Sequence, residues 1–326
     1  VIYMLSSSGG PPWKVPLELR NYPPDYWDYY LSLSPDGSWL AYTTRKEGEE
    51  DAQRSIYLAP TKGGPARRLT QPMTQQPAFS PDGQKIAYVG MLQDPDRDPR
   101  RPLGRQIWIA PVDGGAPVLV YEVARPGRLG SPLWSPDGVT LAFLLNPMQS
   151  GKPAEQVVFV PLSRDGRPAG SPAKIDLPQA TITKLAGWSS DNKIGLVFRS
   201  PELTALYTVP ASGGHAIQVT PKQGWMPTWT PDGKRIYFDG VHGGQLANIE
   251  YVPAQGGPVV RIPVRGPHSL QPSYPTGGIS ISPDGRKILF QGHFYQAPVK
   301  FAPHIFTIPI EGGEVAELAT GLDFPH

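Results

Sequence analysis

Four of the five histidines in the last third of the sequence are the residues that most readily offer chemistry, because a neutral imidazole can ligate a metal or move a proton. They are His242, His268, His293 and His304. Each lies on a separate segment, and no two have the local spacing of a metal-binding pair. A repeated fold can still gather ligands from different repeats, which keeps a metal site as an alternative. We expect no metal and no cofactor.

The sequence lacks the common catalytic signatures. It contains no Gly-x-Ser-x-Gly elbow, no Walker loop and no His-Glu-x-x-His helix. The run Asp94–Asp98 resembles the start of a calcium loop, but Pro99 and Arg105 stand where that loop needs a glycine and an acid. The sequence therefore predicts no catalytic residue and favours a protein without a catalytic centre of its own.

Aromatic side chains near both ends of the chain accompany these histidines. If the first and last segments meet in the fold, they form one sector suited to binding a partner. The alternative is that these aromatic rings pack between structural repeats. The candidate binding residues are Tyr26, Trp27, His242, His268, His293 and Tyr295.

A four-residue repeat indicates which elements must position such a site. Ser-Pro-Asp-Gly precedes an apolar alternating run at Ser34, and the pattern returns along the whole chain, with a worn copy at Ser189–Asn192. Proline sets the second turn position, aspartate accepts backbone N–H groups, and glycine takes the left-handed position. Because the same turn recurs, we predict a structural rather than catalytic role for its aspartates, which are Asp36, Asp82, Asp137, Asp232 and Asp284 in the well-preserved copies.

Each repeat has a second half, an apolar run that ends in proline and leads into a Gly-Gly turn such as Gly63–Gly64. Successive repeats lie between 41 and 55 residues apart. This period, with strand-like contents and no helical pattern, predicts an all-β fold, a β-propeller with six full four-stranded blades in a single domain over residues 1–326. The alternative is seven blades, the closing blade being built from both termini, Val1–Leu5 and Leu322–His326.

Composition limits the kinds of partner that this protein is expected to bind. The 326-residue chain carries a formal charge of +2, which gives no reason to expect nucleic acid. It has no cysteine, and no apolar run approaches the length of a membrane span. Its start at Val1, without a signal-peptide pattern, leaves room for a mature or trimmed chain. We expect other proteins as partners and no transmembrane segment.

The paired Ser-Pro-Asp-Gly and Gly-Gly turns resemble the TolB-like β-propeller family over nearly the whole chain. The resemblance implies a periplasmic or extracytoplasmic setting and attachment to a membrane-associated complex. The predicted function is a non-catalytic scaffold or accessory subunit that docks other proteins. The alternatives are a propeller domain of a larger hydrolase, and a propeller lyase or hydrolase with its site on the face of the long loops.

Overall fold

The computed structural model describes residues 2–4, 13–15, 31–44, 54–92, 104–124, 127–146, 155–176, 181–199, 204–220, 225–242, 245–266, 270–272, 279–294 and 304–319. All regular secondary structure in these ranges is β-strand. No helix that is long and apolar enough to span a membrane occurs in this part of the chain. The chain divides into two compact units, one of Val1–Met4 with Trp13–Gln179 and one that includes Ala180–His326.

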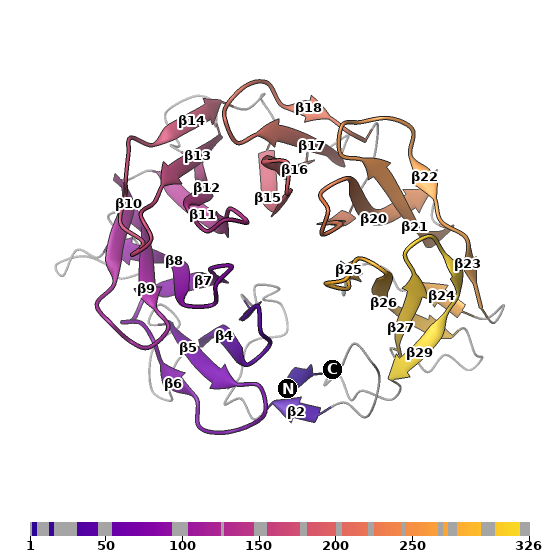
Figure 1. Ribbon diagram of the computed structural model, residues 1–326, viewed down its shortest axis with the longest axis horizontal. Helices are drawn as coiled ribbons and strands as arrows, with labels where there is room; N and C mark the ends of the chain where they lie inside the picture. Colours follow the sequence, from indigo (N-terminus) through magenta and orange to yellow (C-terminus); the bar gives the residue numbers. More distant parts are fainter. Residues whose placement is uncertain are drawn as a thin grey trace. The chain divides into compact units, whose positions relative to one another are not determined.

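Three four-stranded antiparallel sheets make up most of the first unit (Figure 1). The first sheet holds β3 (Leu31–Leu33), β4 (Trp39–Thr44), β5 (Ser55–Pro60) and β6 (Arg67–Arg68). The second holds β7 (Thr74–Phe79), β8 (Lys85–Leu92), β9 (Gly104–Pro111) and β10 (Val118–Ala124). The third holds β11 (Arg128–Trp134), β12 (Thr140–Asn146), β13 (Gln156–Pro161) and β14 (Ala173–Asp176).

The second unit repeats this arrangement. One sheet holds β15 (Thr181–Trp188), β16 (Lys193–Arg199), β17 (Thr204–Pro210) and β18 (Ile217–Gln218). The next holds β19 (Trp225–Trp229), β20 (Arg235–His242), β21 (Gln245–Pro253) and β22 (Val260–Arg261). The last holds β26 (Lys287–Phe294), β27 (His304–Pro309) and β29 (Ala316–Ala319), with its first strand split into β24 (Leu270–Pro272) and β25 (Ile279–Ile281).

These sheets are six four-stranded blades, three in each unit, and the chain has an all-β propeller fold. The prediction of six full blades is confirmed. Besides the blades, β1 (Ile2–Met4) pairs with β2 (Trp13–Val15), and the Trp13 indole donates a hydrogen bond to the Thr61 carbonyl at 2.8 Å. Residues Leu322–His326, which the seven-blade alternative needs, lie outside the described residues.

Short hydrogen bonds explain why Ser-Pro-Asp-Gly joins the first two strands of a blade. In the first copy, the Ser34 hydroxyl donates to the Asp36 carboxylate at 2.6 Å, and the Ser38 amide donates to the same carboxylate at 3.1 Å. The Ser34 oxygen accepts the Trp39 amide at 2.9 Å. Gly37 has a φ of +71°, which favours glycine. The turn is therefore closed by hydrogen bonds among its own residues and does not need a contact with a neighbouring blade.

Successive turns also pack on each other. A Cβ built on Gly83 would lie 3.5 Å from Cδ of Pro35, one blade earlier, and Gly285 stands in the same relation to Pro231. In the worn copy, Ser190 occupies the proline position, and its hydroxyl donates to the Asp232 carbonyl at 2.7 Å. A hydrogen bond thus replaces a van der Waals contact where the motif has changed.

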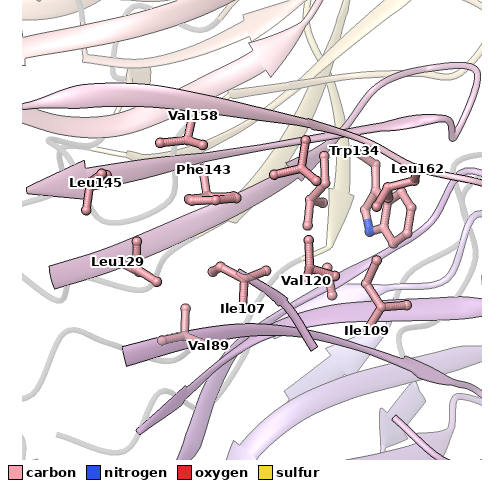
Figure 2. Close-up of a cluster of buried hydrophobic side chains, with 13 residues drawn as sticks. Val89, Ile107, Ile109, Val120, Leu129, Trp134, Phe143, Leu145, Val158 and Leu162 are labelled. Atoms are coloured by element: carbon pink, nitrogen blue, oxygen red, sulfur yellow. The ribbon is translucent and has the colours of Figure 1, made fainter. Parts of the chain in front are cut away.

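The core lies between the blades, and its largest described cluster joins the second and third blades. Figure 2 shows side chains of β8, β9 and β10 directed toward those of β11, β12 and β13. Alternate residues meet there, as the period of two in a strand requires: Ile107 and Ile109 from β9, and Phe143 and Leu145 from β12. Burial of this alternating apolar face holds neighbouring blades together.

The turn aspartates predict how stability depends on pH. The Ser34 hydroxyl, followed by Ser38, lowers the pKa of Asp36 to about 2, and hydroxyl hydrogen bonds are also the leading cause of the lowered pKa values of Asp232 and Asp284. A folded-state pKa below the unfolded value, about 3.9, means that the stabilisation is present above pH 4 and is lost as the pH falls toward 2.

We therefore expect the free energy of unfolding to fall between about pH 4 and pH 2, measured by chemical denaturation. The Asp36→Asn variant should be less stable than the parent near neutral pH, because the amide cannot accept the same bonds. Its deficit should shrink as the pH approaches 2. A deficit of equal size at both ends of this range would contradict the assignment of the titration to Asp36.

Candidate functional site

A cavity of about 480 Å³ lies in the first unit, where the chain passes from the first blade to the second. Its volume falls within the range of small-molecule pockets. One wall is the connecting segment Leu69–Thr74, between β6 and β7. The other walls come from β8, from β9 and from the turn Gly114–Pro117 that leads into β10.

The indole of Trp108 is the largest side chain of this pocket. It lies against β8 at Gly90, since a Cβ built on Gly90 would be 3.0 Å from both Cδ1 and Nε1 of Trp108. The Trp108 Nε1–H donates to Gln106 Oε1 at 3.0 Å, and Gln106 Nε2 donates to a carboxylate oxygen of Glu122 at 2.6 Å. The glycine opposite the ring and this chain of hydrogen bonds hold the indole in one orientation.

Backbone hydrogen bonds to other segments hold the connecting segment Leu69–Thr74 in place. Its residue Met73 is buried and has a φ of +68°, a conformation that is strained for a side chain other than glycine. The Met73 carbonyl accepts the Met91 amide at 3.0 Å, and the Thr74 amide donates to the Arg54 carbonyl at 3.0 Å. This wall is therefore set by long-range hydrogen bonds that offset the local strain.

The lining determines what the pocket can do chemically. Buried Tyr88 contributes to the lining, and burial raises the pKa of its hydroxyl to about 12, so that it stays neutral near pH 7. The described residues that line the pocket include no carboxylate, imidazole, ammonium or guanidinium group. Tryptophan, tyrosine, methionine, threonine and glutamine offer stacking, apolar contact and hydrogen bonding. The pocket is thus equipped for recognition rather than for proton transfer.

Most of the binding residues expected from the sequence fall outside the described residues: Tyr26, Trp27, His268 and Tyr295. The backbone places His242 at the end of β20, opposite Gln245, and His293 in β26, opposite Gln271. Both strands belong to the second unit. Whether these six residues form one sector remains a prediction.

His304, the fourth histidine, begins β27 and is engaged within its own blade. Its Nδ1 is hydrogen-bonded to the Glu317 carboxylate of β29, and its ring stacks on Phe306 with centroids 5.9 Å apart. Among the described residues, no three histidine, cysteine, aspartate or glutamate side chains form a cluster that could hold a metal ion.

Sequence reasoning missed the pocket because its residues lie in predicted strands and turns instead of long loops. By its position in the repeat, Trp108 lies in the apolar run that ends at Pro111 and leads into a Gly-Gly turn, which indicates a strand and no site. A usable signal was present: Gly90 interrupts the apolar second strand of that blade, and glycine in a strand interior often marks the close approach of another group.

Comparison with known proteins supports the fold over most of the chain and does not assign a function. No protein-family model matches the chain. It is 30% identical to an uncharacterized protein of Agrobacterium fabrum over 130 residues, 39% of this chain and 40% of that protein. It is 28% identical to the uncharacterized peptidase YuxL of Bacillus subtilis over 172 residues, 44% of this chain and 24% of the peptidase. The chain thus matches less than half the length of either relative.

Solved structures share the fold at low sequence identity. TolB from Acinetobacter baumannii has a TM-score of 0.52 at 16% identity, covering 86% of this chain and 65% of TolB. The β-propeller domain of the Trilobed protease from Pyrococcus furiosus has a TM-score of 0.59 at 16% identity, and the match covers 90% of this chain and 86% of that domain. An oligogalacturonate lyase in complex with manganese has a TM-score of 0.65 at 15% identity, and the match covers 98% of this chain and 84% of the lyase. At these identities the similarity shows a β-propeller and nothing finer.

Proposed function

We propose that residues 1–326 form one non-catalytic propeller domain that binds other proteins, as a scaffold or accessory subunit. The observation that carries this proposal is the pocket beside Trp108, whose described lining combines apolar and hydrogen-bonding groups and includes no group that is charged near pH 7. Large aromatic side chains in pockets dominate the binding energy of protein interfaces. A periplasmic or other extracytoplasmic setting, beside a membrane-associated complex, follows from the TolB-like resemblance and is part of the same proposal.

The test starts from co-purification of the tagged protein after cross-linking, followed by reconstitution with the purified partner. The Trp108→Ala variant should bind that partner about 30-fold more weakly, the typical loss at an interface hot spot. Ile217→Ala is the control, because it removes a large apolar side chain on β18 of the second unit, outside the lining of the pocket. Trp108 is half-buried and packs against the core of the first two blades, so the free energy of unfolding of Trp108→Ala is measured alongside its affinity. Recovery of the chain only as a free monomer would contradict the proposed function.

A second candidate function is that of a propeller domain in a larger hydrolase. The specific observation in its favour is the match to the peptidase YuxL, which covers 24% of that protein. The sequence of the complete reading frame tests it: a catalytic domain on the same polypeptide would replace the scaffold proposal with this one.

A third candidate is a propeller lyase, favoured by the similarity to the oligogalacturonate lyase that was solved with manganese. Its test is cleavage of oligogalacturonides by the purified protein, with and without added manganese. Release of unsaturated products would assign this activity, and no release under either condition would exclude it.

A further inference from the structure

The outermost strand of the second blade, β10, differs from its counterparts in the other blades. It has 7 residues, Val118–Ala124. The corresponding strands β6, β18 and β22 have 2 residues each, and β14 and β29 have 4 each. Figure 1 shows β10 beside β9, on the side away from β8. The second blade therefore presents the longest outer edge among the described strands.

The free edge of β10 can accept another strand. In the described part of the chain, β10 pairs with β9 and with no other strand. In an antiparallel pair, alternate N–H and C=O groups point away from the partner. The register shifts between Leu119 and Tyr121 and is then continuous through Ala124. That stretch is an exposed template for main-chain hydrogen bonds, which proteins usually shorten or cover.

Packing on one face keeps β10 in place. Tyr121 and Val123 pack against the core shared with the third blade, and the Tyr121 ring lies 5.0 Å from that of Phe143. On the opposite face Leu119 is 40% exposed, and Glu122 is exposed as well. One face of β10 is therefore packed against the core, and the side chains of Leu119 and Glu122 on the other face are exposed.

The free face of β10 borders β9, which lines the pocket. Leu119 lies opposite Trp108 in the register, and Glu122 lies opposite Gln106. Both β9 residues line the cavity. A strand added beside β10 would place alternate side chains on this face, one near the Glu122 carboxylate and the next near the exposed Leu119. Charge complementarity then requires a basic residue and an apolar residue two positions apart.

We propose that β10 binds an extended segment of a partner protein by strand addition, with a basic side chain beside Glu122 and an apolar side chain beside Leu119. This inference rests on the proposed protein-binding function and names the chemistry of the partner. The main chain supplies affinity, and the two side chains supply specificity.

Synthetic peptides test the main-chain part. The probe is a labelled nine-residue peptide of alternating threonine and valine, with one lysine and one leucine two positions apart, made in both orders and measured by fluorescence anisotropy. Two further versions are N-methylated at all odd or all even positions. Strand addition predicts that one version loses at least about tenfold in affinity and the other about twofold or less, because only one set of N–H groups faces β10. Equal effects of both, or no binding of the parent peptide at about 1 mM, would overturn the proposal.

A charge exchange tests the side-chain part. Glu122→Lys should weaken the lysine peptide about fivefold and favour a matched peptide with glutamate in place of lysine by a similar factor. Gln84→Lys, at an exposed turn position between β7 and β8, is the control and should leave the order of the two peptides unchanged. An unchanged preference in the Glu122→Lys protein would overturn the pairing.

The reconstituted complex separates the two proposals. A partner that binds the Glu122→Lys protein as tightly as the parent would keep the protein-binding function and overturn the role of β10. A stable dimer of the parent that Glu122→Lys dissociates, together with no peptide binding, would assign the edge to a second copy of this chain and also overturn the proposal. The chain binding no partner at all would remove the function itself.

Discussion

The Phe143→Ala variant is expected to lose about 3–5 kcal/mol of the free energy of unfolding, the usual cost of removing a buried phenylalanine ring from a packed core. Phe143 is 0% exposed and lies within the cluster that joins the second and third blades (Figure 2). Its ring also packs on Tyr121 of β10, with 5.0 Å between the centroids. The deletion would leave a cavity that the two sheets cannot fill without moving apart.

Chemical denaturation followed by tryptophan fluorescence measures this loss. Val139→Ala is the control, because Val139 is 42% exposed in the neighbouring turn and should cost about 0.5 kcal/mol or less. We also expect faster amide exchange in β10 of the Phe143→Ala protein, since that strand loses its support. Equal stability of the two variants would show that this cluster does not hold the blades together.

The Gly312→Ala variant is expected to lose about 3 kcal/mol or more, for two reasons that act together. Gly312 has a φ of +86°, where an L-residue costs about 1–2 kcal/mol. A Cβ built there would also lie 2.4 Å from the carbonyl oxygen of Pro263 and 2.7 Å from its Cδ. The oxygen belongs to the backbone, so the contact cannot be relieved by a side-chain rotation.

The Gly256→Ala variant separates these two causes. Gly256 occupies the equivalent turn of the preceding blade, with a φ of +85° and nothing within 4 Å of the added Cβ. It should lose only the backbone cost of about 1–2 kcal/mol. The difference in melting and denaturation midpoints between the two proteins measures the clash. Equal losses would mean that the segment at Pro263 moves freely.

The close approach at Gly312 has a structural purpose in the second unit. The Gly313 amide donates to the Pro263 carbonyl at 2.8 Å, and the Val315 amide donates to the Arg265 carbonyl at 2.9 Å. These bonds belong to the parallel pairing of β23 (Val264–Arg265) with β28 (Gly313–Glu314). The glycine lets the turn of the last blade pack on the strand that leaves the preceding blade.

The blade architecture could be predicted because its determinants are local. A turn such as Ser34–Gly37 closes through hydrogen bonds among residues within five positions of each other, so its composition is sufficient evidence for it. The alternating runs on each side give strands whose apolar faces must be buried. Six repetitions of this unit predict six blades, and the sheets confirm them.

The candidate site could not be predicted in the same way. The binding residues predicted from the sequence are histidine and aromatic side chains from segments near both ends of the chain. The described pocket instead depends on Trp108 facing Gly90, and on a connecting segment held by Met91 and Arg54. These contacts join residues that are 18 or more positions apart in the chain. A pattern within a short stretch of sequence therefore cannot predict these contacts.

The sequence by itself determined the all-β class, the positions of the turns and the six full blades, because each of these follows from hydrogen bonding and polarity within a short segment. Only the tertiary structure decided where a surface is left open. Among the described strands, β10 pairs only with β9, and the pocket is lined by β8, by β9 and by the segments that lead into β7 and β10. The physical reason is that exposure depends on what the neighbouring blade fails to cover, a property of two segments in contact and not of either alone.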